Sequence, residues 1–249
     1  MIKAVIFDMD GLMIDSERVT FEGYQKAMGE IGLDISKEFY VTLLGRTVPV
    51  AKKLFQDVYG DDFDLDSVIP LVHQYMADLF DNEGVPIKKG LLPLLKYLKE
   101  NGYKTIVATS SQRKRVDHIL ELAQISQYFD DSICGDEVEH GKPDPEVFLR
   151  SCQKLGVQVD EAIVLEDSEA GIQAAHAGNI KVICIPNMKY PDEKYAKMTT
   201  EIYKLYIREG HQLTFFTFLI YLVNMNLLWT SYKKGERDVG EHLFLRDIW

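Results

Sequence analysis

The sequence predicts an α/β protein with a doubly wound parallel sheet and an inserted all-helical cap. Three observations lead to this fold class. Short apolar runs alternate with helical patterns, the runs are apolar at every position, and one long stretch after the first run contains helical patterns alone. Strands that are apolar throughout are typical of parallel sheets covered by helices on both faces. This architecture places a functional site at the carboxyl ends of the strands.

Five runs rich in Val, Ile and Ala are the expected strands: Ala4–Phe7, Thr105–Thr109, Ser132–Cys134, Ala162–Leu165 and Val182–Ile185. Apolar residues at helical spacing predict four helices among these strands. They cover Gly90–Asn101, Arg113–Ala123, Pro145–Leu155 and Ser168–Ala177, and Gly178 is a candidate C-cap for the last.

The stretch between residues 15 and about 85 has no strand pattern but three apolar helix faces. The first is Phe21, Tyr24, Met28 and Ile31, the second Val50, Leu54 and Val58, and the third Val68, Leu71, Tyr75 and Leu79. A helical insert directly after the first strand is expected to cover the site. We therefore expect a catalytic core of residues 1–14 and 86–205, a cap of residues 15–85, and a C-terminal extension of residues 206–249.

Composition and charge narrow the classes of partner. A chain of 249 residues with 46% hydrophobic and 27% charged residues is ordinary for a soluble globular protein. The net charge of -11 argues against nucleic acid, which is bound by basic surfaces. An anionic small molecule remains compatible, because a local metal ion or lysine acts within a Debye length of about 8–10 Å.

The three cysteines, Cys134, Cys152 and Cys184, lack metal-ligand spacing and are expected to be reduced core thiols. The apolar run Ile2–Phe7 leads straight into Asp8, which leaves no room for a signal peptide. We therefore expect a cytoplasmic protein, either a monomer or a weak dimer.

The first expected strand ends in Asp8-Met9-Asp10-Gly11. Two carboxylates at this spacing can divide the work of a nucleophile and of a general acid/base. Gly11 would let the backbone turn sharply and bring its amides close to an anion. A match this short is weak by itself, because acidic residues often end strands.

Polar residues also follow three later elements. Thr109-Ser110-Ser111 ends the second strand with hydroxyls suited to phosphate oxygens, although each could instead form a turn or an N-cap. Lys142 lies between His140 and Pro145, in a loop that holds two prolines, just before a helix. The strand Ala162–Leu165 runs into Glu166-Asp167-Ser168, where carboxylates could bind Mg²⁺ with Asp8 or could cap the following helix.

Together these four segments resemble the haloacid dehalogenase-like superfamily, in the branch of β-phosphoglucomutase and the small sugar-phosphate phosphatases. The first motif is similar to Phe7-Asp8-Met9-Asp10-Gly11 with the following Asp15-Ser16-Glu17, and the second to Thr109-Ser110-Ser111. The third is similar to Gly141-Lys142-Pro143-Asp144-Pro145, and the fourth to Leu165-Glu166-Asp167-Ser168 with Gly171. The resemblance covers residues 1–205 and implies an enzyme with a Rossmann-like core.

The resemblance also implies roles for these residues. Asp8 would attack phosphorus and form an aspartyl-phosphate, while Asp10 would protonate the leaving oxygen and then activate water. Thr109 and Lys142 would hold the phosphoryl oxygens. Mg²⁺ would be bound by Asp8, Asp10 through its carbonyl, Glu166 and Asp167. Five residues are expected to bind substrate: Gly11, Arg46, Ser110, Ser111 and Arg113.

The implied reaction is magnesium-dependent hydrolysis of a small phosphorylated metabolite, with a sugar or polyol phosphate as the expected substrate. A phosphosugar mutase is the alternative, and it would need a second phosphate site. By resemblance, Thr20 stands at the position of the mutase histidine. The arginine of the cap loop, Arg46, is displaced by two residues from the position of the mutase arginine. Arg46 or Arg113 could still bind a distal anion. A non-catalytic protein on the same fold is a further alternative.

The resemblance ends near Met198–Leu205, where relatives close the domain with a last helix. Beyond it, Leu213–Thr230 contains 18 consecutive uncharged residues, close to the shortest membrane-spanning length. Asn224 and Asn226 weaken that reading. Three alternatives stay open for this run: a membrane helix, a helix packed on the core or on a dimer partner, and an extension without function.

Overall fold

The computed structural model describes residues 1–202, 207–208 and 211–212. Its main feature is a parallel sheet with the strand order β3-β2-β1-β4-β5-β6, and every neighbouring pair runs parallel. The strands are β1 (Ala4–Phe7), β2 (Lys104–Ala108), β3 (Asp131–Ile133), β4 (Ala162–Glu166), β5 (Lys181–Cys184) and β6 (Glu201–Ile202). The predicted α/β fold with a doubly wound parallel sheet is confirmed, and β1 lies near its centre.

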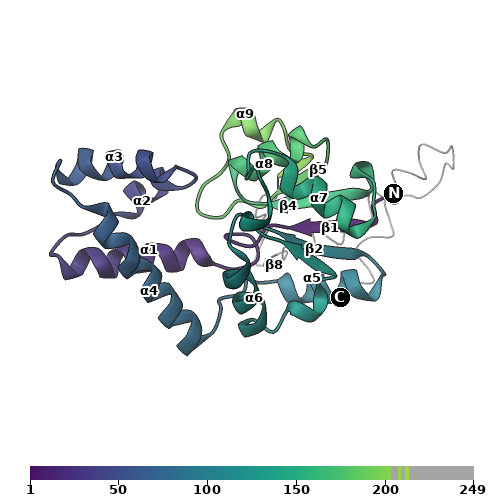
Figure 1. Ribbon diagram of the computed structural model, residues 1–249, viewed down its shortest axis with the longest axis horizontal. Helices are drawn as coiled ribbons and strands as arrows, with labels where there is room; N and C mark the ends of the chain where they lie inside the picture. Colours follow the sequence, from purple (N-terminus) through teal and green to yellow (C-terminus); the bar gives the residue numbers. More distant parts are fainter. Residues whose placement is uncertain (203–206, 209–210, 213–249) are drawn as a thin grey trace.

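Helices cover both faces of this sheet (Figure 1). They are α5 (Leu91–Glu100), α6 (Arg113–Leu122), α7 (Glu146–Leu155), α8 (Glu169–Ala177) and the short α9 (Glu193–Ala196). One apolar core contains residues of α5 and α6 with Val5 and Phe7 of β1. The other contains residues of α7 and α8 with Ala4 and Ile6. Successive residues of β1 therefore face opposite cores, which explains why the strand is apolar at every position.

At residues 201–202 the core has a strand where the resemblance implied part of a closing helix. Glu201 and Ile202 pair with Ile183 and Cys184 as the edge strand β6. A two-residue strand is too short to show a period in the sequence and is fixed by its pairing partner. The three cysteines are free and buried, as predicted.

The insertion after β1 consists of four helices, which form the cap beside the sheet in Figure 1. They are α1 (Ser16–Glu30), α2 (Lys37–Leu43), α3 (Val48–Tyr59) and α4 (Leu65–Glu83). The cap has its own apolar cluster, which includes Met28, Phe55 and Val72. Helix α2, with Ser36 as its N-cap, was not predicted from the sequence.

The second predicted apolar face, Val50, Leu54 and Val58, which lies on α3, was wrong. Val50 and Val58 are 45% and 57% exposed, whereas Phe55 is fully buried. Phe55 stacks on Phe63 with ring centroids 5.1 Å apart, and it also contacts Tyr24 and Phe39. A large aromatic ring buries more apolar area than a valine, so Phe55 sets the rotation of α3.

Two linkers join the cap to the core and lie side by side. Ile14 forms an antiparallel bridge with Ile87, and the Asp15 amide donates to the Pro86 carbonyl at 2.8 Å. Lys88 Nζ then donates to Asp15 Oδ1 at 2.6 Å. These contacts hold the first residues of α1 next to the end of β1.

Little of the C-terminal extension is described. Ile207–Arg208 and His211–Gln212 form the short antiparallel strands β7 and β8. The apolar run 213–230, for which a membrane helix was one alternative, lies outside the described residues. Within the described ranges, no helix combines the length and apolar character needed to cross a membrane.

Candidate active site

Three neighbouring strands bring the predicted catalytic residues to one edge of the sheet. Asp8 follows β1, Thr109 follows β2, and Glu166 and Asp167 lie at the end of β4. The Asp8 amide donates to the Leu165 carbonyl at 3.0 Å, so the pairing of β1 with β4 extends to Asp8. Parallel pairing therefore places these side chains together, although Asp8 and Glu166 are more than 150 residues apart in sequence.

Lys142 enters this group from the loop before α7. Its Nζ donates to Asp8 Oδ1 at 2.6 Å, to Glu166 Oε1 at 2.7 Å and to the Ala108 carbonyl at 3.1 Å. The lysine side chain is 5% exposed, and those of Asp8 and Glu166 are 10% and 0% exposed. All three ammonium hydrogens thus have acceptors, which a buried lysine needs to remain charged.

The charges of this cluster are unbalanced. Carboxylate oxygens of Asp8, Glu166 and Asp167 lie within 4.8 Å of one another, and Lys142 is the cation that contacts two of them. Burial raises the pKa of Asp8 to about 7, opposed by Lys142 and reinforced by Glu166. Burial and the charges of Glu166 and Asp8 also raise the pKa of Asp167 well above its usual range. A divalent cation would relieve this repulsion, so the donor set fits Mg²⁺, which prefers carboxylate oxygens.

Two glycines leave room for these carboxylates. A Cβ at Gly11, whose φ is +80°, would lie 2.0 Å from Asp167 Oδ2. A Cβ at Gly171 would lie 1.8 Å from Glu166 Oε1. Atoms cannot approach so closely, and therefore each acidic side chain occupies a space that only a glycine leaves open.

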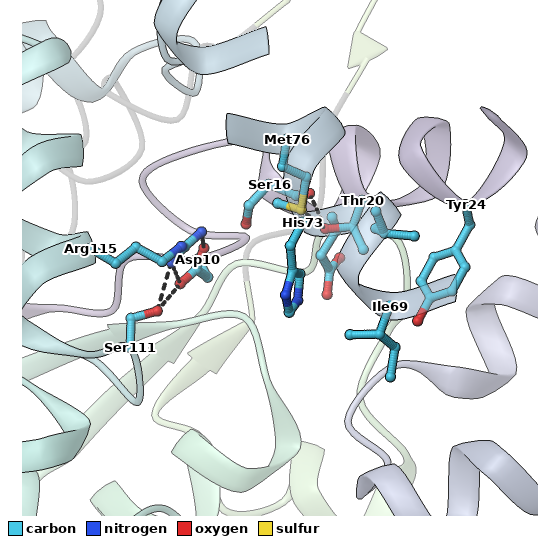
Figure 2. A pocket seen from close by; sticks show the side chains of 11 residues that line it. Asp10, Ser16, Thr20, Tyr24, Ile69, His73, Met76, Ser111 and Arg115 are labelled. Atoms are coloured by element: carbon cyan, nitrogen blue, oxygen red, sulfur yellow. Dashed lines mark hydrogen bonds and ion pairs between the residues drawn. The ribbon is translucent and has the colours of Figure 1, made fainter. Parts of the chain in front are cut away.

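Asp10 has a different set of partners (Figure 2). Both of its oxygens accept from Arg115, at 2.7 Å from Nη1 and 2.8 Å from Nη2, and Ser111 Oγ donates to Oδ2 at 2.8 Å. Burial would raise the pKa of Asp10, but the hydrogen bonds and charge of Arg115 outweigh it and lower the pKa. Asp10 is therefore held as a carboxylate.

These residues form the core wall of a cavity of about 420 Å³ beneath the cap (Figure 2). Its lining comprises Asp10, Ser111 and Arg115 from the core and Ser16, Glu17, Thr20, Tyr24, Ile69, Val72, His73 and Met76 from the cap. Thr20 does not extend freely into this space, because its Oγ1 donates to the Ser16 carbonyl at 2.8 Å and contacts Met76 Sδ at 3.2 Å.

Four of the five residues expected to bind substrate lie outside the cavity lining. Arg113 is engaged by Glu137, Asp117 and Ser132. Arg46 is exposed, and its Nε lies 3.4 Å from the Thr42 carbonyl. Ser110 is exposed, and the Gly11 amide donates within its own loop, to the Ile14 carbonyl and to Ser16 Oγ. Ser111 is the expected substrate contact that the structure places in the cavity.

Sequence reasoning missed Arg115 and gave no role to Glu17 or His73. The signal for Arg115 was its place four residues after Ser111, in the first turn of α6, which begins at Arg113. Their contact is direct, with Arg115 Nη1 2.6 Å from Ser111 Oγ. Glu17 was noted only as part of the first motif, and His73 had no sequence pattern that would point to it.

Comparison with known proteins agrees with this geometry. Residues 5–185 match the family model described as haloacid dehalogenase-like hydrolase. A phosphorylated carbohydrates phosphatase of Thermotoga maritima is 29% identical, over 73% of this chain and 83% of the relative. A fructose-1-phosphate phosphatase of Escherichia coli is 27% identical, over 72% of this chain and 94% of the relative. A β-phosphoglucomutase structure from Clostridium difficile shares the fold, with a TM-score of 0.63, 24% identity and coverage of 92% of this chain and 100% of that one.

Proposed function

The chain belongs to the haloacid dehalogenase-like hydrolase family and is a phosphoric monoester hydrolase, and on this premise we propose a specific reaction for it. The proposed reaction is Mg²⁺-dependent hydrolysis of a small sugar or polyol phosphate through a phosphorylated Asp8. The observation that carries this proposal is the buried contact of Asp8 with Lys142 at the end of β1, next to Glu166.

In the first proposed step, an Asp8 carboxylate oxygen attacks phosphorus and the bond to the leaving oxygen breaks. Lys142 and the Thr109 hydroxyl hold the phosphoryl oxygens. Asp10, which Arg115 holds as a carboxylate, must first take up a proton from water, and it then passes that proton to the leaving oxygen. In the second step a water attacks phosphorus, Asp10 takes its proton, and inorganic phosphate leaves Asp8. The short Asp8–Lys142 contact supports this assignment, because the ammonium would stabilise charge on the phosphoryl group.

We propose that Asp8, Asp167 and the Asp10 carbonyl hold Mg²⁺, which would neutralise charge on the phosphoryl oxygens. Glu166 has a different proposed role, because both of its oxygens already have partners. Oε1 accepts from Lys142, and Oε2 accepts from the Ser168 amide at 2.7 Å and the Ser168 hydroxyl at 2.9 Å. Glu166 would therefore orient Lys142 from beside the metal site.

The proposed substrate class rests on the cavity and on the relatives. The cap encloses a space of a few hundred Å³, which suits a small leaving group, and two relatives are named for phosphorylated carbohydrates. A mutase would need a cationic site for a second phosphate. Among the described residues, Arg115 is the permanent cation of the cavity lining, and both of its terminal nitrogens already bind Asp10, so it is not free to bind a second phosphate.

The test is phosphate release from a panel of sugar, polyol and nucleotide monophosphates, with Mg²⁺ and with EDTA. We expect metal-dependent release from sugar or polyol phosphates, and at least about a thousandfold loss in Asp8→Asn, because the attacking oxygen is removed. Asp160→Asn, at an exposed position of the core, is the matched control and should retain full activity. Equal release by Asp8→Asn would contradict the proposed nucleophile.

A further inference from the structure

Glu17 is a carboxylate in the cavity wall that the proposed reaction does not use. It lies in the first turn of α1, is partly buried, and lines the cavity together with Asp10. Among the described residues, the one hydrogen bond recorded for its carboxylate comes from the Met188 amide, at the long distance of 3.4 Å. A carboxylate can accept several hydrogen bonds, so Glu17 retains unused acceptor capacity.

The surroundings of Glu17 do not neutralise it. Burial raises the pKa of its carboxyl, and the hydrogen bond from Met188 and the charge of Lys88 oppose this effect without overcoming it. Lys88 itself donates to Asp15 and Asn187, both at 2.6 Å. A partly buried carboxylate with few hydrogen bonds raises the free energy of the folded protein unless a hydrogen-bond donor binds to it. A ligand in the cavity can supply that donor.

The rest of the cavity defines the chemistry of such a ligand. Glu17 and Asp10 bring two carboxylates to the lining, whereas the described residues contribute one guanidinium, that of Arg115, which already binds Asp10. His73 and Thr20 add polar groups, and a set of apolar side chains completes the cap wall, namely Ile69, Val72 and Met76. Polar groups beside an apolar surface suit a chain or ring that carries hydroxyls on one side and C–H groups on the other. A second anion would meet net negative charge.

We propose that Glu17 is a specificity-determining residue that accepts hydrogen bonds from hydroxyls of the leaving group and excludes leaving groups with a second negative charge. This inference rests on the proposed function, since it assigns the leaving group of the same reaction. It defines the substrate class as phosphate monoesters of uncharged polyhydroxylated compounds. Bisphosphates and phosphorylated sugar acids fall outside that class.

Two six-carbon compounds test the inference because they differ at one terminal carbon. Sorbitol 6-phosphate has a hydroxymethyl group where 6-phosphogluconate has a carboxylate. Their dissociation constants would be measured by calorimetry with Mg²⁺ on the full-length Asp8→Asn protein, with Glu17 present and with Glu17→Gln added. The comparison needs no turnover, so it gives a result whether or not the phosphatase proposal holds.

With Glu17 present, we expect sorbitol 6-phosphate to bind at least about tenfold more tightly, the usual effect of one hydrogen bond to a charged group. Glu17→Gln should bring the two constants to within about threefold. The matched control is Glu22→Gln on the same helix, since Glu22 pairs with Arg18 outside the cavity lining, and it should leave the ratio unchanged.

Three outcomes overturn the inference: an unchanged ratio in Glu17→Gln, tighter binding of 6-phosphogluconate to the protein with Glu17, or no measurable binding of either compound. The proposed function is tested separately by release of p-nitrophenol from p-nitrophenyl phosphate by the native protein. If release fails while the binding ratio responds to Glu17, the reaction is wrong and the binding assignment stands.

Discussion

The core cluster of Asp8, Lys142 and Glu166 differs from the cap wall of the cavity in how firmly its polar groups are held. On the core side, Lys142 is almost fully buried and contacts Asp8, Glu166 and the Ala108 carbonyl, all within 3.1 Å. On the cap side, the described part of the chain gives the Glu17 carboxylate a single long hydrogen bond, and His73 is exposed. This difference separates two tasks, because the phosphoryl group is common to all substrates whereas the leaving group varies. The groups that act on the phosphoryl group are therefore held firmly by the core, whereas the cap keeps hydrogen-bond acceptors free for the leaving group.

Replacing Lys142 should have the largest effect on the firmly held groups of the core. In Lys142→Met, Asp8 and Glu166 lose their shared cation, so we expect about a hundred- to thousandfold lower kcat and about 3–5 kcal/mol lower stability. Activity assays and urea unfolding measure the two effects. Lys197→Met is the control, because Lys197 forms an exposed pair with Glu193 and should affect neither quantity. Unchanged stability in Lys142→Met would show that the contacts of Lys142 with Asp8 and Glu166 do not hold the core cluster together.

A smaller change tests the close packing around Glu166 in the same core cluster. In Gly171→Ala the new methyl group would collide with Glu166 Oε1, and the forced shift should lower the free energy of unfolding by about 1–3 kcal/mol. Gly29→Ala in α1 is the matched control, because no atom lies within 4 Å of its added Cβ. That cap variant should be more stable by about 0.5–1 kcal/mol, since alanine favours helix over glycine. Equal changes in the free energy of unfolding of the two variants would contradict the difference between the core cluster and the cap.

Arg115 lies in the cavity lining and binds Asp10, and its loss should have the smallest effect of the three. In Arg115→Met, Asp10 keeps Ser111 but loses the hydrogen bonds that fix both of its oxygens, so we expect about tenfold lower kcat/KM. Steady-state kinetics on the best substrate of the panel measure the change.

Arg113→Met is its control, because Arg113 binds Glu137 and Ser132 away from the cavity. It should lower the melting temperature and leave kcat/KM unchanged. If instead Arg113→Met lowers kcat/KM and Arg115→Met does not, the original assignment of Arg113 to substrate binding would be restored.

The sequence by itself determined the parts of this protein that depend on short segments. Strands β1 to β5 lie within a residue of their predicted limits, because buried parallel strands are apolar at every position. The placement of the motif residues follows from these strand limits. Once Asp8, Thr109 and Glu166 were expected at the ends of strands in one parallel sheet, the topology brought them to the same edge.

Tertiary structure alone decided which side chains meet. Arg113 and Arg115 are two residues apart on α6, so they point to nearly opposite sides of the helix. Chain spacing could not tell which of them reaches Asp10. The rotation of α3 around Phe55, the pairing of β6 with β5 and the long contact of Glu17 with Met188 likewise depend on segments far apart in sequence. Local patterns encode strands and helices, but the partner of each polar group is set by how those elements pack.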